Sequence, residues 1–280
     1  PFIVVVQAPN DGLTNAVTTP STGIVDDLLA ADAERSDWYH VLKDDRTDAI
    51  SLALAEAVEG YTRPITAGVQ SNAADVQTAA TDDIASIMQA AEISRTWLWW
   101  HTPATEGCEY AIAGKQLPKA PGSTNWAGQG LVSVVGIDLQ NGLVSESILQ
   151  SKNCNWLERF AAKGVQMTRY GISPGGLYID LVRGRDWLVD LIQTRFLELK
   201  LNEDVIRYTD EGGRAQIIAT LRGALNEAAS PDIGLITPDF TISAPTVAEQ
   251  SATSRGNRDF PGVRFDATLS GSSIGSLSSL

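Results

Sequence analysis

Short apolar segments alternate with longer amphipathic segments from the beginning of this sequence to about residue 117. The short segments have strand length, whereas the longer ones repeat apolar residues every three or four positions, which is typical of helices. The sequence predicts strands at residues 2–6, 38–42, 65–69 and 96–100 and helices at residues 25–34, 47–58, 81–93 and 106–117. Strands that alternate with helices pair in parallel through helical crossovers. We therefore expect an α/β fold, with a layered, mostly parallel or mixed sheet that helices cover on both faces.

A different pattern begins after residues 121–131, PGSTNWAGQGL, where three Gly and a Pro cannot hold a regular element. Alternating residues at 164–171 and 177–182 flank the turn sequence SPGG and predict a hairpin. The apolar spacing then lengthens to three and four, which predicts a long helix up to residue 201 with one inward face. The residues of that face are Trp187, Leu188, Leu191, Ile192, Phe196 and Leu199. A second helix is expected at residues 214–228, and end strands at 239–243 and 263–269.

These patterns divide the chain into three expected parts. Residues 1–155 form an α/β core domain, and residues 156–270 form a C-terminal α+β domain with the hairpin, two long helices and the end strands. Residues 271–280, GSSIGSLSSL, are of low complexity and are expected to be a flexible tail. The sequence begins with Pro1 and runs at once into the apolar FIVVV, so we expect an N-terminal portion of the whole protein to be missing from it.

The charge of the chain argues against one large class of partners. There are 21 basic and 34 acidic side chains, a formal net charge of −13. A surface of this sign repels phosphate backbones, so we expect no nucleic-acid binding. No apolar run approaches the roughly 18 residues that a membrane helix needs, so no membrane insertion is expected. The two cysteines, Cys108 and Cys154, lack the paired spacing of a metal site and are expected to be buried thiols.

Nucleotide-binding motifs are absent from the sequence. The glycine-rich segment 121–131 lacks the lysine of a phosphate-binding loop, and there is no dinucleotide fingerprint. Gly271, Ser273 and Gly275 match the G-x-S-x-G nucleophile elbow, but no histidine follows them to act as the base. We therefore expect no catalytic residue, no cofactor and no metal site in this chain.

The strand ends offer the best enzymatic alternative. His40 and His101 are the only histidines, and each closes an apolar run, WYH and WLWWH, while Asp44 and Asp45 follow the expected strand 38–42. Enzymes of the α/β class hold their substrates at the carboxyl ends of parallel strands. The commoner interpretation is a buried histidine satisfied by backbone and a pair of solvated turn carboxylates. A nearby aromatic run is expected to fill core volume rather than stack on a ligand: Trp97, Trp99 and Trp100.

Two charged groups are candidates for contact with another protein. Arg183, Arg185 and Asp186 stand beside a tryptophan at the beginning of the long helix, and arginine with tryptophan is the composition that interface centres favour. An ion pair inside the chain is the other interpretation, and the sequence leaves both open. Arg264 and Asp266 are expected on the outward side of the last strand, where they are further candidates for assembly contacts.

Several blocks of this sequence resemble the tail sheath proteins of contractile-tailed bacteriophages and related prophage particles. The resemblance is carried by YIDLVRGRDWLVDLIQTRFLELKLN and the following IRYTDEGGRAQIIATLRGAL. Upstream blocks are DWYHVLKDDRTDAISLALAEAVEG, RTWLWWH, LPKAPGSTNWAGQGL and SKNCNWLERFAAKGVQMTRYGISPGG, and the downstream block is FTISAPTVAEQSATSRGNRDFPGVRFDATLSG. These blocks stand in the order that they have in the family, and the resemblance as a whole covers roughly residues 24–271.

The resemblance implies a structural protein that is not an enzyme. Sheath subunits stack as rings, commonly hexameric, around a tail tube and shorten together to drive the tube through the host envelope. The implied partners are further copies of the chain, the tail tube protein, the baseplate and the tail terminator. The implied location is the tail of the virion, after assembly in the host cytoplasm. A baseplate or adaptor protein with a sheath-like fold is the alternative within the same particle.

The sequence departs from the family at both ends. The family carries further sequence ahead of the point where Pro1 begins, and it continues after the ATLSG-like block with an apolar strand, whereas SSIGSLSSL here is small and polar. Both ends of sheath subunits are typically extended arms that add a strand to a neighbour's sheet. The resemblance therefore implies that a chain without these arms folds as a monomer and does not polymerise.

Overall fold

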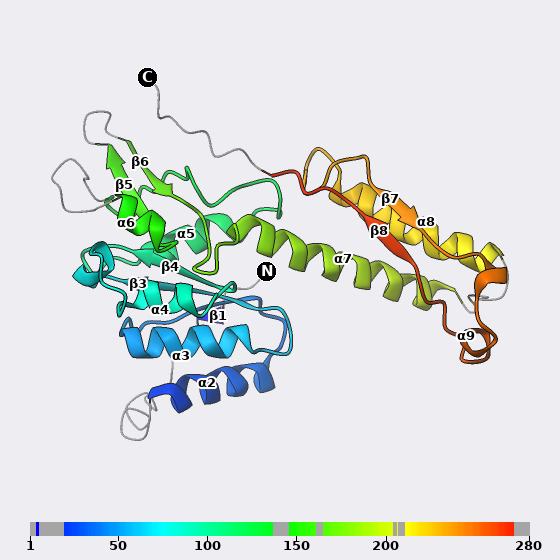
Figure 1. The fold of residues 1–280 in the computed structure, drawn as a ribbon, viewed down its shortest axis with the longest axis horizontal. Coiled ribbons are helices and arrows are strands. Elements are labelled where there is room, and N and C mark those ends of the chain that lie inside the picture. The colour runs from blue at the N-terminus through cyan, green and yellow to red at the C-terminus, as the bar shows by residue number, and fades with distance from the viewer. Residues whose placement is uncertain are drawn as a thin grey trace. The chain divides into compact units, whose positions relative to one another are not determined.

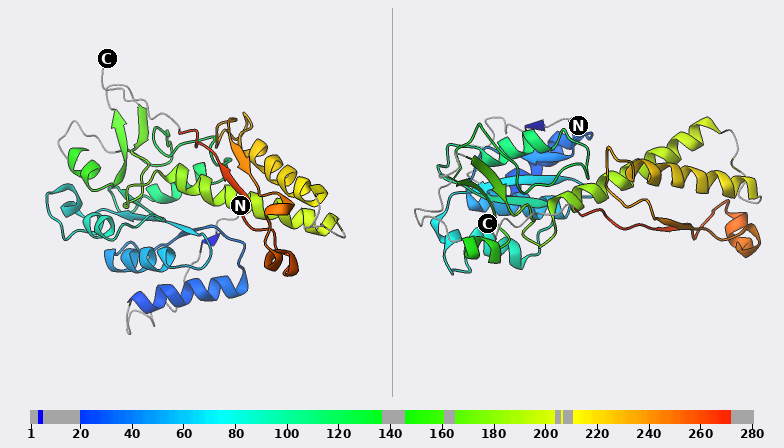
Figure 2. Two further views of the ribbon diagram at one scale, coloured as in Figure 1. Left: turned by 45° about the vertical axis from the view of Figure 1, so that its right-hand side comes forward. Right: turned by 90° about the horizontal axis from the view of Figure 1, so that it is seen from above.

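The computed structural model describes residues 4–5, 20–136, 146–160, 165–203, 206 and 211–271. These residues fall into two compact units (Figures 1 and 2). The first unit takes in the described residues up to Lys119 and then Asn125–Val182, and the second takes in Ala120–Thr124 and the residues from Arg183 onward. The boundary expected between residues 155 and 156 instead falls inside a strand of the first unit.

The first unit is built on a six-stranded sheet of order β1-β2-β3-β4-β5-β6. Its strands are β1 (Val4–Val5), β2 (His40–Leu42), β3 (Thr66–Ser71), β4 (Thr96–Trp100), β5 (Asn155–Phe160) and β6 (Val165–Arg169). Neighbours from β1 to β5 pair in parallel, and β6 pairs antiparallel with β5. The expected α/β fold with a mixed sheet is therefore confirmed. Of the expected first strand only Val4–Val5 is described, and the rest lies outside the described residues.

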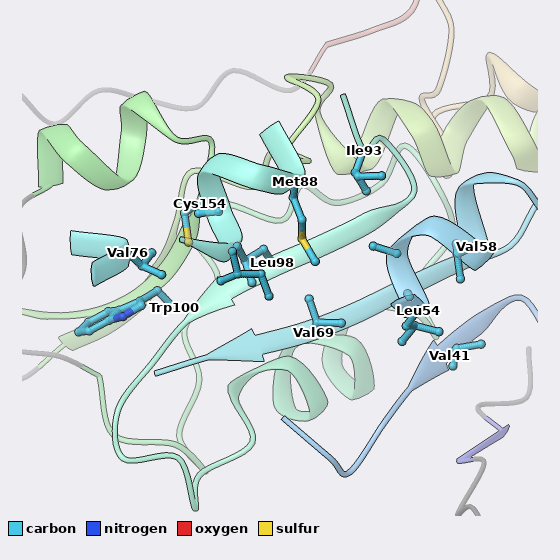
Figure 3. Packing of buried hydrophobic residues seen from close by; sticks show 14 of the residues in the cluster. Val41, Leu54, Val58, Val69, Val76, Met88, Ile93, Leu98, Trp100 and Cys154 are labelled. Carbon is cyan, nitrogen blue, oxygen red and sulfur yellow. The ribbon is translucent and has the colours of Figure 1, made fainter. Parts of the chain in front are cut away.

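Helices cover both faces of this sheet. They are α2 (Pro20–Glu34), α3 (Asp48–Glu59), α4 (Ile84–Ala90), α5 (Cys108–Gln116) and α6 (Glu146–Ser151), with a 3-10 turn η1 (Ala74–Gln77). Successive strand residues point to opposite faces. Leu98 and Trp100 of β4 therefore join the core cluster that holds residues of α2, α3, α4 and α6 (Figure 3). Trp97 and Trp99 join the second cluster, against α5. The three tryptophans fill core volume, as expected.

The hairpin lies one strand earlier than the sequence predicted. The predicted hairpin used residues 164–171 and 177–182, whereas the antiparallel pair is β5 with β6. Residues 177–182 are not a strand, because α7 (Ile179–Asn202) already begins there and Tyr178 makes an isolated bridge to Ile172. The side chain of Asn155 decides this: its Nδ2 donates to the carbonyl oxygens of Leu98 and Ile172, and its Oδ1 accepts from the Ile172 N–H. The chain is thus tied to the beginning of β5, at Asn155, before it turns into the helix.

The irregular glycine-rich segment lies along the outer edge of β6. The Gly128 N–H donates to the Thr168 carbonyl at 2.7 Å, and the Thr168 N–H donates to the Gln129 carbonyl at 2.9 Å. The Thr168 hydroxyl also donates to the Trp126 carbonyl at 2.7 Å. An uncovered edge strand is a site for unwanted pairing with other chains. This segment therefore closes that edge of the sheet along the middle of β6.

The second unit holds most of α7, then α8 (Glu211–Ala228) and an antiparallel pair of strands, β7 (Thr241–Ser243) and β8 (Arg264–Asp266) (Figure 1). A 3-10 turn η4 (Val247–Glu249) and α9 (Ala252–Gly256) come between the two strands in the sequence. The core of this unit is formed by Leu188, Leu221, Leu225, Ala228, Leu235 and Ile236. The two long helices and the end strands are confirmed, although both strands are shorter than the sequence predicted.

The inward face of α7 agrees in part with the predicted face. Leu188 is buried, and Ile192 and Phe196 are half-buried and pack against the core of the second unit. Leu191 and Leu199 are only half-buried and do not belong to that cluster. Gly184 makes the close approach, since a Cβ there would lie 2.3 Å from Leu235 Cδ1. A larger residue at position 184 would therefore push α7 away from Leu235.

Two further predictions concern the ends of the chain and membranes. The expected tail lies outside the described residues except for Gly271, and so do Ser273 and Gly275 of the G-x-S-x-G match. Within the part of the chain that the structure describes, no helix is both long enough and apolar enough to span a membrane.

Candidate functional site

The carboxyl ends of β2, β3 and β4 carry a group of buried polar side chains. His101, directly after β4, is fully buried, and its Nε2 lies 3.3 Å from Glu106 Oε2. The Gln70 side chain of β3 donates to the Glu106 carbonyl at 2.8 Å and accepts from the Cys108 N–H at 2.8 Å. Glu106 Oε2 also accepts from the Val135 N–H at 3.0 Å. These bonds attach the loop after β4 to the sheet.

His101 is held in its neutral form by this environment. Burial lowers the pKa of His101, and the opposing effect of Glu106 is smaller. Among the described residues its Nδ1 has no hydrogen-bond partner. The ring is therefore part of the buried polar contacts that hold the loop after β4.

A second buried group lies at the end of β2. Arg46 Nε donates to Glu109 Oε1 at 2.7 Å, and its Nη1 donates to the Ala104 carbonyl at 2.6 Å. Burial raises the pKa of Glu109, against the lowering effect of Arg46. Lys43 donates to the carbonyl of Asp45 and is almost fully buried. The sequence analysis did not predict this group. Two signals for it were present: Lys43 directly follows the apolar run WYHVL, and Glu109 directly follows Cys108, which was expected to be buried.

Asp44 and Asp45 do not join the histidine. Both carboxylates are exposed, and Asp45 Oδ1 accepts from the Thr47 N–H at 2.8 Å, just before α3 begins. Within the described residues no group of three or more His, Cys, Asp and Glu side chains could hold a metal ion. The structure therefore does not bring the suggested residues His101, Asp44 and Asp45 together as one catalytic arrangement.

The candidate assembly residues divide into two kinds. Arg183 and Asp186 are buried and have partners within the chain, so they are not available as a free surface. Arg185 is exposed on α7, and Arg264 and Asp266 are exposed on β8. Replacement of Arg183 or Asp186 would disturb the folded chain itself, because a buried charge would lose its partner. Arg185, Arg264 and Asp266 therefore remain candidates for contact with another protein.

The cysteines have the environment that the sequence predicted. Cys108 and Cys154 are both free and buried. Burial raises the pKa of each thiol far above its ordinary value. Since the thiolate is the reactive form, neither side chain is suited to act as a nucleophile or a metal ligand.

Replacement of Lys43 by methionine is expected to stabilise the protein. Burial lowers the pKa of Lys43 to about 8, so the folded state binds its proton more weakly than the unfolded state does. The charged ammonium is carried by both states at about pH 7, where Lys43→Met should raise the free energy of unfolding by about 1–3 kcal/mol. Urea denaturation of the wild type and the variant measures the difference.

The difference in free energy of unfolding between the wild type and Lys43→Met should depend on pH. Above about pH 8 the folded state releases the Lys43 proton, while the unfolded state keeps it up to the ordinary value of 10.5. The wild type therefore gains stability in that window, and its difference from Lys43→Met should narrow between about pH 8 and 10. Lys200→Met on the exposed side of α7 is the control, with no expected change. A Lys43→Met variant less stable than the wild type at about pH 7 would contradict the prediction.

Comparison with solved structures shows a likeness in fold. No protein-family model matches the sequence, and none of the curated proteins matches it. A chain in the six-fold symmetrised cryo-EM structure of the anti-feeding prophage (AFP) baseplate is similar, with a TM-score of 0.59 and 12% sequence identity. The match covers 91% of this chain and 72% of that chain. The two chains share one fold. At this identity the likeness concerns the backbone, and it assigns no role to an individual side chain.

Proposed function

We propose that this chain is a structural subunit of a contractile phage-like particle, and that its place in the particle is the tail sheath. It polymerises as stacked, hexameric rings around a tail tube and contracts to drive the tube through the host envelope. Its partners are further copies of itself, the tube protein, the baseplate and the tail terminator. It is not an enzyme, and it belongs to the virion after assembly in the host cytoplasm.

The observation that carries the proposal is the shared fold. The match to a chain of the AFP baseplate structure extends over 91% of this chain, so it includes both compact units rather than a common α/β core alone. The sequence blocks that resemble sheath proteins span the same two units. The hydrogen bonds at the strand ends are consistent with a structural role, because His101, Glu106 and Gln70 are engaged with one another and with backbone.

The proposed mechanism stores energy in contacts between subunits. Contraction needs a body whose core persists while its surface contacts exchange, and a sheet packed between helices suits that need. The driving force is then the difference between two sets of intersubunit contacts rather than the hydrolysis of a nucleotide. ATP hydrolysis by the purified protein above the background rate would contradict this mechanism.

A baseplate or adaptor protein is the second candidate function. The similar chain comes from a structure of a baseplate, which favours this candidate directly. Sheath and baseplate proteins would differ in how their rings associate. A sheath subunit stacks ring upon ring, whereas a baseplate or adaptor protein forms a single ring or joins one.

Electron microscopy distinguishes the two. The protein expressed from its whole gene is purified and viewed by negative stain, alone and with the tail tube protein. Tubes or stacked rings are expected for the sheath function, and single rings would favour the baseplate or adaptor function. A protein that remains monomeric under both conditions would count against both.

A further inference from the structure

The chain enters the second unit at two points. The first is a short loop, residues 120–124, which belongs to the second unit although Lys119 before it and Asn125 after it belong to the first. The second is α7, which belongs to the second unit from Arg183 onward. The 120–124 loop is therefore a piece of the second unit that the first unit carries.

The base of the 120–124 loop is closed within the first unit. Gln116, at the end of α5, is fully buried, and its Nε2 donates to the Asn125 carbonyl at 3.1 Å. The Lys119 N–H donates to the Gln116 carbonyl at 3.1 Å. Trp126, directly after Asn125, is buried in the core cluster against α5. The two ends of the loop are thus held in place as long as the first unit is folded.

The tip of the loop is a tight turn. The Ser123 N–H donates to the Ala120 carbonyl at 3.2 Å, and the Ser123 hydroxyl donates to the same carbonyl at 2.7 Å. Pro121 and Gly122 lie between these residues, and Gly122 has a φ of 86°. Proline followed by glycine at positive φ is typical of a type II turn. Since proline fixes its own φ, little conformational entropy is lost when this turn packs against the rest of the second unit.

Gly122 packs directly on the backbone of the second unit. A Cβ at position 122 would lie 2.8 Å from the Ile233 carbonyl oxygen and 2.8 Å from Leu235 Cα, which is closer than a side-chain carbon approaches such atoms. Leu235 is buried, its N–H donates to the Ala228 carbonyl, and its own carbonyl accepts from the Ser270 N–H. Because this backbone is held on both sides, it cannot move aside for a side chain, and glycine is required at the tip of the loop.

The second entry of the chain reaches the same leucine. Gly184 directly follows Arg183 in α7, and a Cβ there would lie 2.3 Å from Leu235 Cδ1. Gly122 thus packs on the backbone of Leu235, and Gly184 packs on its side chain. We call these three residues the Leu235 clamp. Both segments through which the chain enters the second unit therefore meet at one buried residue.

We propose that the Leu235 clamp couples the stabilities of the two units. The 120–124 loop packs on Leu235 only while the first unit holds its ends and the second unit presents Leu235, so this packing is lost whichever unit unfolds. A contact of this kind stabilises both units by the same amount, because coupling between two parts of a molecule is reciprocal. The inference concerns the single folded chain and stands whether or not the chain assembles.

Hydrogen exchange of the whole chain at low urea concentrations tests this coupling. The slowest amides of α8 report the opening of the second unit, and the slowest amides of β4 report the opening of the first. Gly122→Ala should lower the protection factors of both sets by about ten-fold or more, because alanine disfavours a φ of 86° and its Cβ collides with Leu235.

Gly128→Ala is the matched control in the first unit. Gly128 has a φ of 71° in the same irregular segment, but a Cβ there would meet nothing within 4 Å. This variant should lower the protection of the β4 amides by about five-fold and leave the α8 amides within about two-fold of the wild type. Ile217→Val, at a buried position of α8, should do the reverse, with a loss of about five-fold in α8 and less than about two-fold in β4.

Two results would overturn the proposal. If Gly122→Ala lowers the protection of the α8 amides alone, the 120–124 loop stabilises the second unit without coupling it to the first. If Gly122→Ala exchanges like the wild type in both sets, the clamp contributes to neither unit. Loss of protection in both sets, with each control confined to its own unit, is the expected result.

Discussion

Asp83→Ala is expected to lower the free energy of unfolding by about 3–5 kcal/mol, which is the cost of breaking a buried ion pair together with a helix cap. Asp83 and Lys152 are both almost fully buried, and Lys152 Nζ lies 2.5 Å from Asp83 Oδ2. Asp83 Oδ1 also accepts from the Ala85 N–H at 3.0 Å and the Ser86 N–H at 3.2 Å at the beginning of α4. The variant leaves the Lys152 ammonium buried without its carboxylate.

The control for Asp83 is an ion pair of the same length on the surface. Arg35 Nε lies 2.5 Å from Asp37 Oδ1, and both side chains are more than half exposed. Asp37→Ala should leave the free energy of unfolding close to that of the wild type, since water solvates the arginine that remains. Urea denaturation of both variants gives the comparison. Equal effects of the two replacements would show that burial of the pair does not determine its contribution.

The loss of free energy of unfolding in Asp83→Ala should also depend on pH. Burial alone would raise the pKa of Asp83, but the hydrogen bonds from Lys152 and Ser86 bring it below the ordinary value of 3.8. A lowered pKa means that the folded state favours the ionised carboxylate. Its contribution is present above about pH 4 and is lost as the pH falls through the lowered value. The difference between the wild type and Asp83→Ala should therefore shrink below about pH 4.

Trp126→Ala is expected to cost about 3–5 kcal/mol, although the residue lies in an irregular segment. Its ring is buried with its centroid 4.4 Å from that of Trp97, which in turn stacks on His40 at 4.8 Å. Its carbonyl accepts from Thr168, and the segment after it closes the edge of β6. Loss of the indole leaves a large cavity and loosens the segment. Hydrogen exchange at the Gly128 and Thr168 amides should become faster.

Val132→Ala is the control for Trp126. Val132 follows in the same irregular stretch and is fully exposed, so its replacement should change stability by less than about 0.5 kcal/mol. The free energies of unfolding of both variants come from urea denaturation. A Trp126→Ala variant that loses less than about 1 kcal/mol would mean that the segment is held by its backbone bonds alone.

The layered sheet was predictable because its signals are local. The alternation of strand and helix segments specifies parallel pairing, and the burial of β4 follows from its continuous apolar run, TWLWW. The assignment of Trp97 to one face and Trp100 to the other follows from the two-residue period of a strand. These properties depend on neighbours in the sequence, which is why they can be read from it.

The predicted hairpin was wrong for a reason that lies far along the chain. LYIDLV alternates like a strand, but Ile179 and Val182 are the buried positions, and their spacing of three is that of a helix. A six-residue segment fits both periods, and the pairing of β5 with β4 and the bonds of Asn155 decide between them. Leu98, which accepts one of the Asn155 bonds, is 57 residues away from Asn155 in the sequence. A pattern confined to a few neighbouring residues therefore cannot reveal this contact.

The sequence by itself determined the α/β class, the two long helices, the buried tryptophans and thiols, and the negative charge. Only the tertiary structure decided that His101 is buried beside Glu106, that Gln70 binds the Glu106 carbonyl, and that Arg183 and Asp186 are buried. The first group follows from residue type and spacing along the chain. The second group depends on which side chains come into contact after folding. The burial and the pKa of a side chain are set by those neighbours and not by the residue type alone.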